Sequence, residues 1–216
     1  MIQTLRIKFW ERLALNAFAT SRFDKARQAF ERILRLDPER QGVRYNLGLV
    51  QLSAKNFTAA RDLFLEEQAR HGDSLNVKKA LAETAYRIGD RMTAQKNYTA
   101  VAAMSHSQKE KAFCKQRAAL CRDPESFSRT TTAHELLDQA DGLLHKKDYD
   151  QAEKLFREAC HQDPTCFQAF NNIGAIRLAQ KDYPTARDFF LKADALVDMP
   201  AVTNNLKYIA RKSFDR

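Results

Sequence analysis

Small and aromatic residues recur along this chain at a spacing that is typical of paired amphipathic helices. Ala14 is followed by a second small residue, Ala26, 12 positions later, and by an aromatic residue, Phe30, after 4 more. The same spacing recurs at Gly48/Ala60/Phe64, Ala82/Ala94/Tyr98, Ala140/Ala152/Phe156 and Gly174/Ala186/Phe190. Successive sets begin 34, 34, 58 and 34 residues apart, and a period of this size predicts an array of structural repeats.

Each period contains two short amphipathic segments, so the chain is predicted to be all-α and built from helical hairpins. The small residues let the paired helices approach closely, and the aromatic residue fills the space between one hairpin and the next. The predicted hairpins span residues 7–40, 41–74, 75–108, 133–166 and 167–200. Stacked hairpins need a cap at the end of the array, and we assign this role to a helix over 201–216.

Residues at the key positions of these hairpins resemble the tetratricopeptide repeat, whose 34 residues carry an aromatic residue, Leu-Gly, Ala, a second aromatic residue and Pro. The matching positions are Trp10, Leu13, Ala14, Ala26, Phe30 and Pro38 in the first unit, Leu47 and Gly48 in the second, and Pro164 and Pro200 at the ends of the last two. Some positions depart from this pattern. Arg44 and Lys78 replace the opening aromatic residue, Gln139 replaces Leu, and Gly72 and His106 stand where Pro would end the unit. The resemblance implies a right-handed α-solenoid of five repeats that serves as a protein-interaction scaffold.

An insertion of 24 residues separates the third repeat from the fourth. We predict an extra helix over 108–121, then a polar linker or hinge over 125–132, where Thr132 and Glu135 form a capping-box pattern for the next helix. This predicts an N-terminal subdomain over 1–124 and a C-terminal subdomain over 133–216. A continuous solenoid through the insertion remains an open alternative.

The family resemblance implies that the first helices of successive repeats line a concave groove that binds an extended peptide or a helix. The residues expected to line this groove are Lys8, Arg12, Phe18, Tyr45, Asn46, Lys79 and Arg87 in the N-terminal half, and Asp138, Asp141, Asn171, Asn172 and Asn205 in the C-terminal half. Residues 1–132 carry 24 basic and 14 acidic side chains, whereas residues 133–200 carry 8 basic and 12 acidic ones. The basic half is therefore expected to favour an acidic segment or a terminal carboxylate.

Two ligand modes known in related proteins can be compared with this groove. The clamp that grips a chaperone's C-terminal carboxylate uses two Lys, two Asn and one Arg, and the corresponding positions here are Glu11, Leu15, Asn46, Asn76 and Ala80. Only Asn46 agrees, so we do not expect this chain to bind the chaperone C-terminus. Asn46 and Asn172 also resemble the asparagine ladder of O-linked sugar transferases, in which each amide donates to and accepts from a peptide backbone.

Charge and composition leave two other binding functions open. The net charge is +9, which would suit RNA, although the sequence has no Lys/Arg-rich run with interleaved aromatic residues. Self-association through the groove is the other alternative, and the sequence does not fix the oligomeric state.

The sequence gives little support for an enzyme or a cofactor protein. It has no Gly-rich phosphate loop, no H-E-x-x-H and no nucleophile elbow, and its five histidines lack ligand spacing. The four cysteines lack C-x-x-C pairing, so we expect neither a metal nor a cofactor. No apolar run reaches the length of a membrane span, and a cytoplasmic location is expected, with an upstream anchor or signal left open.

Overall fold

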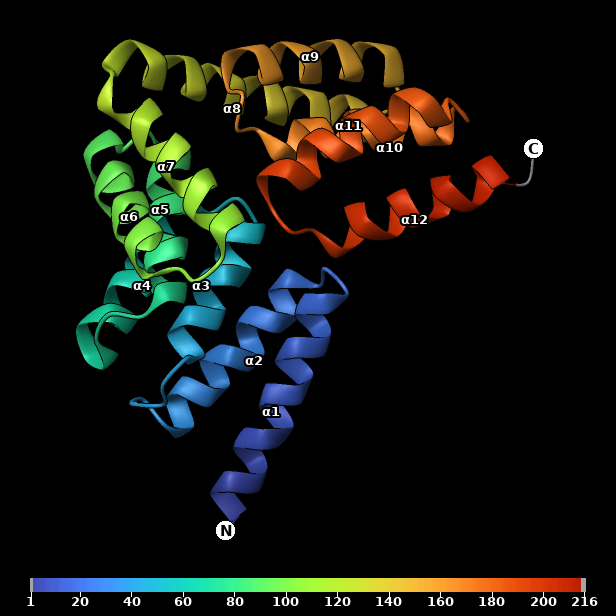
Figure 1. The fold of residues 1–216 in the computed structure, drawn as a ribbon. Helices are drawn as coiled ribbons and strands as arrows, with labels where there is room; N and C mark the ends of the chain where they lie inside the picture. The colour runs from blue at the N-terminus through green and yellow to red at the C-terminus, as the bar shows by residue number, and fades with distance from the viewer. Residues whose placement is uncertain (1, 215–216) are drawn as a thin grey trace. The chain divides into compact units, whose positions relative to one another are not determined.

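The computed structural model describes residues 2–214 and consists of helices, with no strand among these residues (Figure 1). The helices are α1 (Ile2–Ala19), α2 (Phe23–Leu36), α3 (Val43–Ser53), α4 (Phe57–His71), α5 (Leu75–Ile88), α6 (Arg91–Met104), α7 (Gln108–Arg122), α8 (Pro124–His145), α9 (Tyr149–Gln162), α10 (Phe167–Ala179), α11 (Tyr183–Leu196) and α12 (Pro200–Phe214). They divide into two compact units, Met1–Val101 and Ala102–Arg216.

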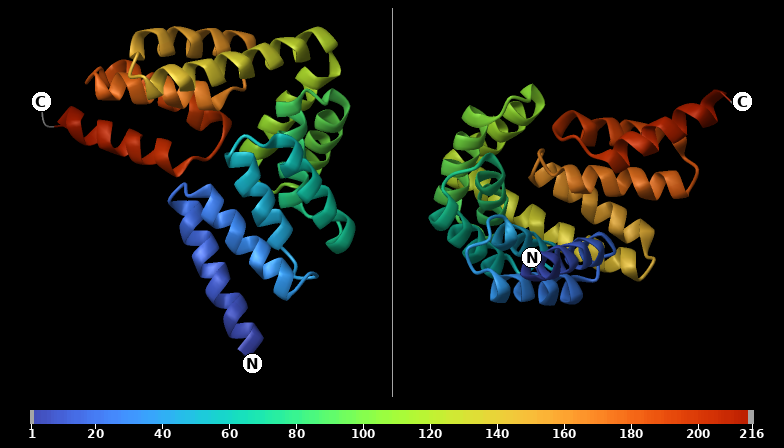
Figure 2. Two further views of the ribbon diagram at one scale, coloured as in Figure 1. Left: turned by 180° about the vertical axis from the view of Figure 1, so that it is seen from behind. Right: turned by 90° about the horizontal axis from the view of Figure 1, so that it is seen from below.

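The first unit contains three helical hairpins, α1/α2, α3/α4 and α5/α6. Figure 2 shows α1 alongside α2 in both views, and each later hairpin follows on the one before it, with α2 packed on α3 and α4 packed on α5. The core of the first hairpin includes Ala14, Ala26 and Phe30, the residues of the repeating pattern, and all three are buried. The hairpins predicted for this part of the chain are therefore present.

Glycine permits the closest helix approaches within these hairpins. A Cβ atom on Gly48 of α3 would lie 2.4 Å from Cε1 of Phe64 on α4, and a Cβ atom on Gly174 of α10 would lie 2.8 Å from Cδ1 of Phe190 on α11. Both aromatic side chains are fully buried. The small–aromatic spacing of the sequence therefore corresponds to direct contact between the two helices of a hairpin.

Each hairpin turn places one residue in the left-handed backbone region just after the first helix. Gly89 occupies this position in the third hairpin, whereas the other four turns use residues with a side chain. These residues are Ser21, Lys55, Lys147 and Lys181, with φ between 55° and 64°. The left-handed residue ends the helix and reverses the chain, and a side chain there carries a steric cost that glycine avoids.

The cations that replace the family's opening aromatic residue are both partnered. Arg44 is almost fully buried, and its Nη1 donates to the backbone oxygen of Pro38 at 2.6 Å while its Nε lies 3.2 Å from Oε2 of Glu66. Lys78 pairs with Asp73 at 3.1 Å. The departures therefore exchange an apolar contact for an ion pair without disturbing the hairpins.

The second unit contains the hairpins α8/α9 and α10/α11, together with α7 and α12. Helix α12 packs on α11, where Val202 and Ile209 join the buried cluster around Phe190. It takes the place of the predicted cap. The extra helix predicted over 108–121 is α7.

The structure differs from the predicted linker over 125–132, because these residues belong to α8. The Asp123 carboxylate caps this helix by accepting from the Ser126 backbone N–H at 2.7 Å, and Pro124 occupies its first turn. Thr132 and Glu135, predicted to start a helix, lie in its interior. The polar composition of 125–132 predicts a loop, although Phe127 and Thr130 are buried side chains of the helix and Pro124 is typical of a helix start.

Helix α7 was predicted to end the N-terminal subdomain, but it belongs to the second unit, where it packs against α8 and α11. The Arg117 side chain is fully buried, and its Nε donates to Oγ1 of Thr165 at 2.9 Å. Phe113 packs edge-on against Phe167 with ring centroids 5.9 Å apart. Lys109 pairs with Asp198 at 2.6 Å. The compact units accordingly divide after Val101 rather than at the predicted linker.

Candidate functional site

In the first unit, the first helices of the second and third hairpins, α3 and α5, contact each other directly. Tyr45 and Asn46 of α3 are half-buried, and Lys79 of α5 is exposed. Burial raises the pKa of the Tyr45 phenol, and the neighbouring Lys79 ammonium partly offsets this rise. Tyr45 and Lys79 are therefore neighbours on two adjacent first helices, and Asn46 follows Tyr45 in α3. We call these three residues the α3/α5 surface.

The other predicted groove residues of the first unit have separate surroundings. Phe18 packs against Phe23 across the first hairpin turn, with ring centroids 6.2 Å apart. The Arg87 guanidinium lies 4.9 Å from the ring centroid of Phe57, at the start of α4. Lys8 and Arg12 are exposed on α1. Phe18 and Arg87 thus also contribute to packing between helices of the unit.

In the second unit, three of the predicted residues meet in one hydrogen-bond network. Nδ2 of Asn172 on α10 donates to Oδ1 of Asp141 on α8 at 3.3 Å. Nδ2 of Asn171 donates to Oδ1 of Asn172 at 3.2 Å. Asp138 is exposed one turn before Asp141, and Asn205 is half-exposed on α12.

Asn46 and Asn172 occupy the same position of the repeat but differ in what they bond. The Asn172 amide uses its oxygen and one N–H inside the network. No side-chain hydrogen bond of Asn46 occurs within residues 2–214. An amide without an internal partner has both donors and its acceptor free for a peptide backbone.

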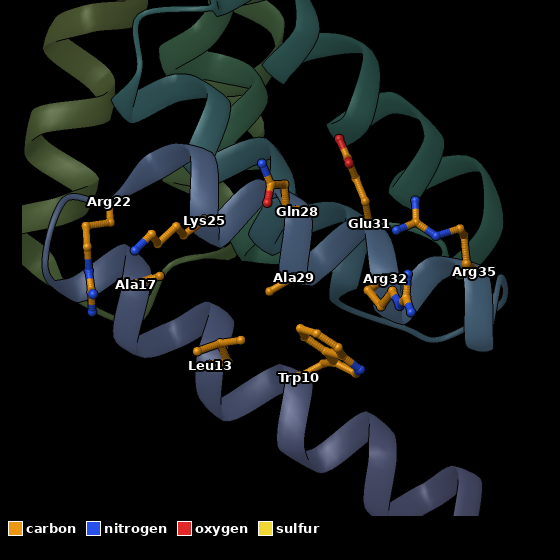
Figure 3. A pocket seen from close by; sticks show the side chains of 10 residues that line it. All are labelled: Trp10, Leu13, Ala17, Arg22, Lys25, Gln28, Ala29, Glu31, Arg32 and Arg35. Atoms are coloured by element: carbon orange, nitrogen blue, oxygen red, sulfur yellow. The ribbon is translucent and has the colours of Figure 1, made fainter.

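Sequence reasoning missed an open pocket of about 580 Å³ between α1 and α2 (Figure 3). Its lining residues are Trp10, Leu13, Ala17, Arg22, Lys25, Gln28, Ala29, Glu31, Arg32 and Arg35. Leu13, one of the key positions of the first repeat, is 40% exposed. The spacing of Leu5, Phe9 and Leu13 indicates an apolar stripe on one side of α1. Only the structure shows that all three side chains are 40% exposed or more.

Within residues 2–214, no group of three His, Cys, Asp or Glu side chains is placed to hold a metal ion. In the same part of the chain, none of the helices combines the length and the apolar content that crossing a membrane requires.

The comparisons with known proteins agree on one family. The sequence pattern described as "Tetratricopeptide repeat" matches residues 11–74 and 137–198, which together exceed half of the chain. No curated protein matches the chain significantly.

Solved structures of helical repeat proteins have a similar fold. MamA from Desulfovibrio magneticus RS-1, from residue 41 of that protein to its end, is 12% identical, with a TM-score of 0.52 over 88% of this chain and 94% of that one. A tetratricopeptide repeat protein from Parabacteroides merdae is 13% identical, with a TM-score of 0.50 over 95% and 99%. At these identities the likeness concerns the fold alone. Because the repeat pattern matches most of the chain and the hairpins, their close-packed glycines and their capping helix are all present, this chain belongs to the tetratricopeptide repeat family.

Proposed function

We propose that this chain is a non-catalytic interaction scaffold that binds an extended acidic segment of a partner protein on the α3/α5 surface of its first unit. The observation that supports this proposal is that Lys79 of α5 neighbours the Tyr45 phenol of α3, on two first helices that contact each other. The half-buried Tyr45 ring, which packs against Phe64, the Asn46 amide and the exposed Lys79 ammonium would supply an aromatic group, an amide and a cation to a ligand. An extended peptide presents apolar, amide and charged groups that suit these three in turn.

The charge of the first unit favours an acidic ligand. Met1–Val101 contains 18 Lys and Arg residues against 11 Asp and Glu residues. The exposed cations Lys8 and Arg12 of α1 belong to the same unit as Lys79. Cations that stay solvated until binding speed the approach of an acidic segment and discriminate against basic ones.

The residues of the second unit are given a secondary role in this proposal. Asp138, Asp141, Asn171, Asn172 and Asn205 form an amide-rich and acidic set, which would suit a polar or basic segment rather than an acidic one. Asn172 would have to release Asp141 or Asn171 before it could hold a peptide backbone with all of its groups. We therefore expect Asn46 to contribute more to peptide binding than Asn172.

The test begins with a displayed library of random 12-residue peptides, selected on the immobilised full-length chain. Selected peptides should be enriched in Asp and Glu. Binding of a labelled selected peptide is then measured by fluorescence anisotropy with Lys79→Glu and Asn46→Ala variants. We expect Lys79→Glu to weaken binding about tenfold, which corresponds to about 1.4 kcal/mol, and Asn46→Ala to weaken it about fivefold.

The matched control is Lys96→Glu, because Lys96 is also an exposed lysine of the first unit but lies on a second helix, α6. It should leave the affinity within about twofold of that of the unmodified chain. Equal losses for Lys79→Glu and Lys96→Glu would show that net charge rather than the α3/α5 surface drives binding. Tighter, steeply salt-dependent binding of a labelled oligouridine would replace the proposal with RNA binding, and a dimer dissociated by Lys79→Glu in light scattering would replace it with self-association.

A further inference from the structure

The first unit has a second candidate surface, which lies at its first hairpin and is distinct from the α3/α5 surface. Leu5 and Phe9 of α1 are 63% and 61% exposed, and Leu13, at the same helical spacing, is 40% exposed. Phe9 packs edge-on against Trp10 with ring centroids 5.3 Å apart. Trp10 and Leu13 both line the pocket between α1 and α2. The stripe and the pocket therefore form one continuous apolar surface, which we call the α1/α2 surface.

This surface has the dimensions of a helix-binding groove. Leu5 and Leu13 are eight residues apart, which spans about 12 Å along α1. Figure 3 shows Trp10 pointing from α1 toward α2, with Ala29 of α2 on the opposite side, and Leu13 of α1 also lines the pocket. Small residues at Ala17 and Ala29 leave the pocket open between the two helices. The stripe matches about two turns of a docked helix with apolar residues every three or four positions.

The charges around the α1/α2 surface are strongly one-sided. Arg22, Lys25, Arg32 and Arg35 of α2 and the preceding turn line the pocket. Lys8 and Arg12 are exposed on α1. Their helical positions place them beside the stripe, on the side that faces away from the pocket.

Two carboxylates near this surface, Glu31 and Glu11, already have partners. Glu31 accepts from Arg27 at 3.0 Å, and Figure 3 shows it pointing away from Trp10 and Leu13. Glu11 accepts from Arg40 at 2.8 Å. An apolar stripe bordered by cations on both sides complements a helix whose apolar face is bordered by Asp and Glu.

We propose that the α1/α2 surface docks an acidic amphipathic helix of another protein. The chemistry disfavours a second copy's exposed terminal helix as the occupant, because α12 presents Lys207, Arg211 and Lys212 and would bring cations against cations. The concave pocket favours a helix over a flat membrane surface, because side chains of a docked helix can enter it. Such docking leaves the α3/α5 surface free for a separate segment.

The probe for this proposal is a stapled 16-residue helix with leucines at every third or fourth position, glutamates beside them and a fluorescein label. Its twin carries lysine in place of each glutamate. Binding to the full-length chain is measured by anisotropy. The glutamate helix should bind with a Kd below about 100 µM, and the lysine twin should bind at least tenfold more weakly.

Two pairs of variants locate the site. Phe9→Glu should weaken binding of the glutamate helix at least tenfold, whereas Met92→Glu, at a residue on α6 that is also 63% exposed, should change it less than twofold. Lys25→Glu should weaken binding about fivefold and reduce its salt dependence, whereas Lys96→Glu should not. Lys79→Glu should leave helix binding unchanged, which separates this surface from the α3/α5 surface.

Several outcomes would overturn the proposal. These are no binding of the glutamate helix, equal binding of its lysine twin, or equal losses for Phe9→Glu and Met92→Glu. Binding of vesicles of phosphatidylcholine and phosphatidylserine that Phe9→Glu abolishes, without binding of the helix, would assign the surface to a membrane instead. A concentration-dependent dimer that Phe9→Glu dissociates would assign it to self-association.

Discussion

Adding a single methyl group at Gly174 measures how tightly α10 and α11 pack against each other. A Cβ atom at this position would lie 2.8 Å from Cδ1 and Cε1 of Phe190 and 3.1 Å from its Cγ. Ordinary carbon contacts are about 3.5–4.0 Å, so the ring would have to retreat by about 0.7 Å. Phe190 is fully buried among Ala193, Val202 and Ile209, and it has little space into which to move.

Two opposing effects set the size of the change for Gly174→Ala. Alanine favours a helix interior over glycine by about 1 kcal/mol, whereas overpacking a buried site costs about 1–3 kcal/mol. The variant should therefore lose between about 0 and 2 kcal/mol of unfolding free energy. Gly142 of α8 supplies the matched control, because it is also helical but a Cβ atom there would meet nothing within 4 Å. Gly142→Ala should gain about 0.5–1 kcal/mol.

The assay is urea unfolding followed by helical circular dichroism, and both glycines lie in the second unit, so the same part of the fold reports both changes. The two variants should differ in unfolding free energy by about 1–3 kcal/mol, the overpacking term alone. Gly174→Ala in a Phe190→Leu background should regain part of the loss, with a coupling of at least about 0.5 kcal/mol. Equal stabilisation of Gly174→Ala and Gly142→Ala would refute the close-packing explanation of the repeated small–aromatic spacing.

Three further predictions concern other features of the second unit. Lys147→Gly should raise the unfolding free energy by about 1 kcal/mol in urea titrations, because φ is 62° there, whereas Lys146→Gly, at an ordinary right-handed position, should lower it. For Glu153, burial would raise the pKa, but hydrogen bonds from Arg177 and Arg157 outweigh burial and leave the pKa below its usual 4.5. The Glu153 carboxylate therefore stabilises the fold above about pH 4.5, and this stabilisation is lost as the pH falls through the folded pKa. The difference in unfolding free energy between the unmodified chain and Glu153→Gln should shrink on acidification in urea titrations at several pH values. A constant difference would contradict this. Burial raises the pKa of the Cys160 thiol to about 12. Cys160 of the folded chain should therefore resist a disulfide reagent at pH 8 and react after unfolding. Peptide mass mapping identifies the modified thiol.

Much of the fold was predictable because the repeat constrains local sequence and packing together. Ala14, Ala26 and Phe30 recur as a set because one contact between two helices needs all three at fixed positions. The start of α8 was not predictable in this way. Its Ser and Thr residues favour a loop by composition, yet Thr130 and Thr131 donate to the backbone oxygen of Phe127 within the helix, at 2.8 and 3.4 Å.

The unit boundary also lay beyond the sequence pattern. Arg117 would ordinarily be assigned to the surface, because a charged side chain is rarely buried without a partner. Its partner, Thr165, is 48 residues away in the sequence and itself donates to Asp163 at 2.6 Å. A contact between residues this far apart has no periodic signal, so α7 could not be assigned to the second unit before the structure was known.

The candidate site illustrates the same distinction between position and surroundings. The repeat places Asn46 and Asn172 at equivalent points, and a rule based on position alone gives them one role. Position in a repeat fixes where a side chain leaves the helix, but its neighbours decide which of its hydrogen-bonding groups remain available. Asp141 lies within reach of Asn172 and takes one of its donors, whereas Asn46 has Tyr45 beside it in the sequence and the Lys79 ammonium close to that phenol. Asn172 has an anionic neighbour, whereas the first unit carries an excess of cations that includes Lys79, and this difference is why we assign an acidic ligand to the first unit alone.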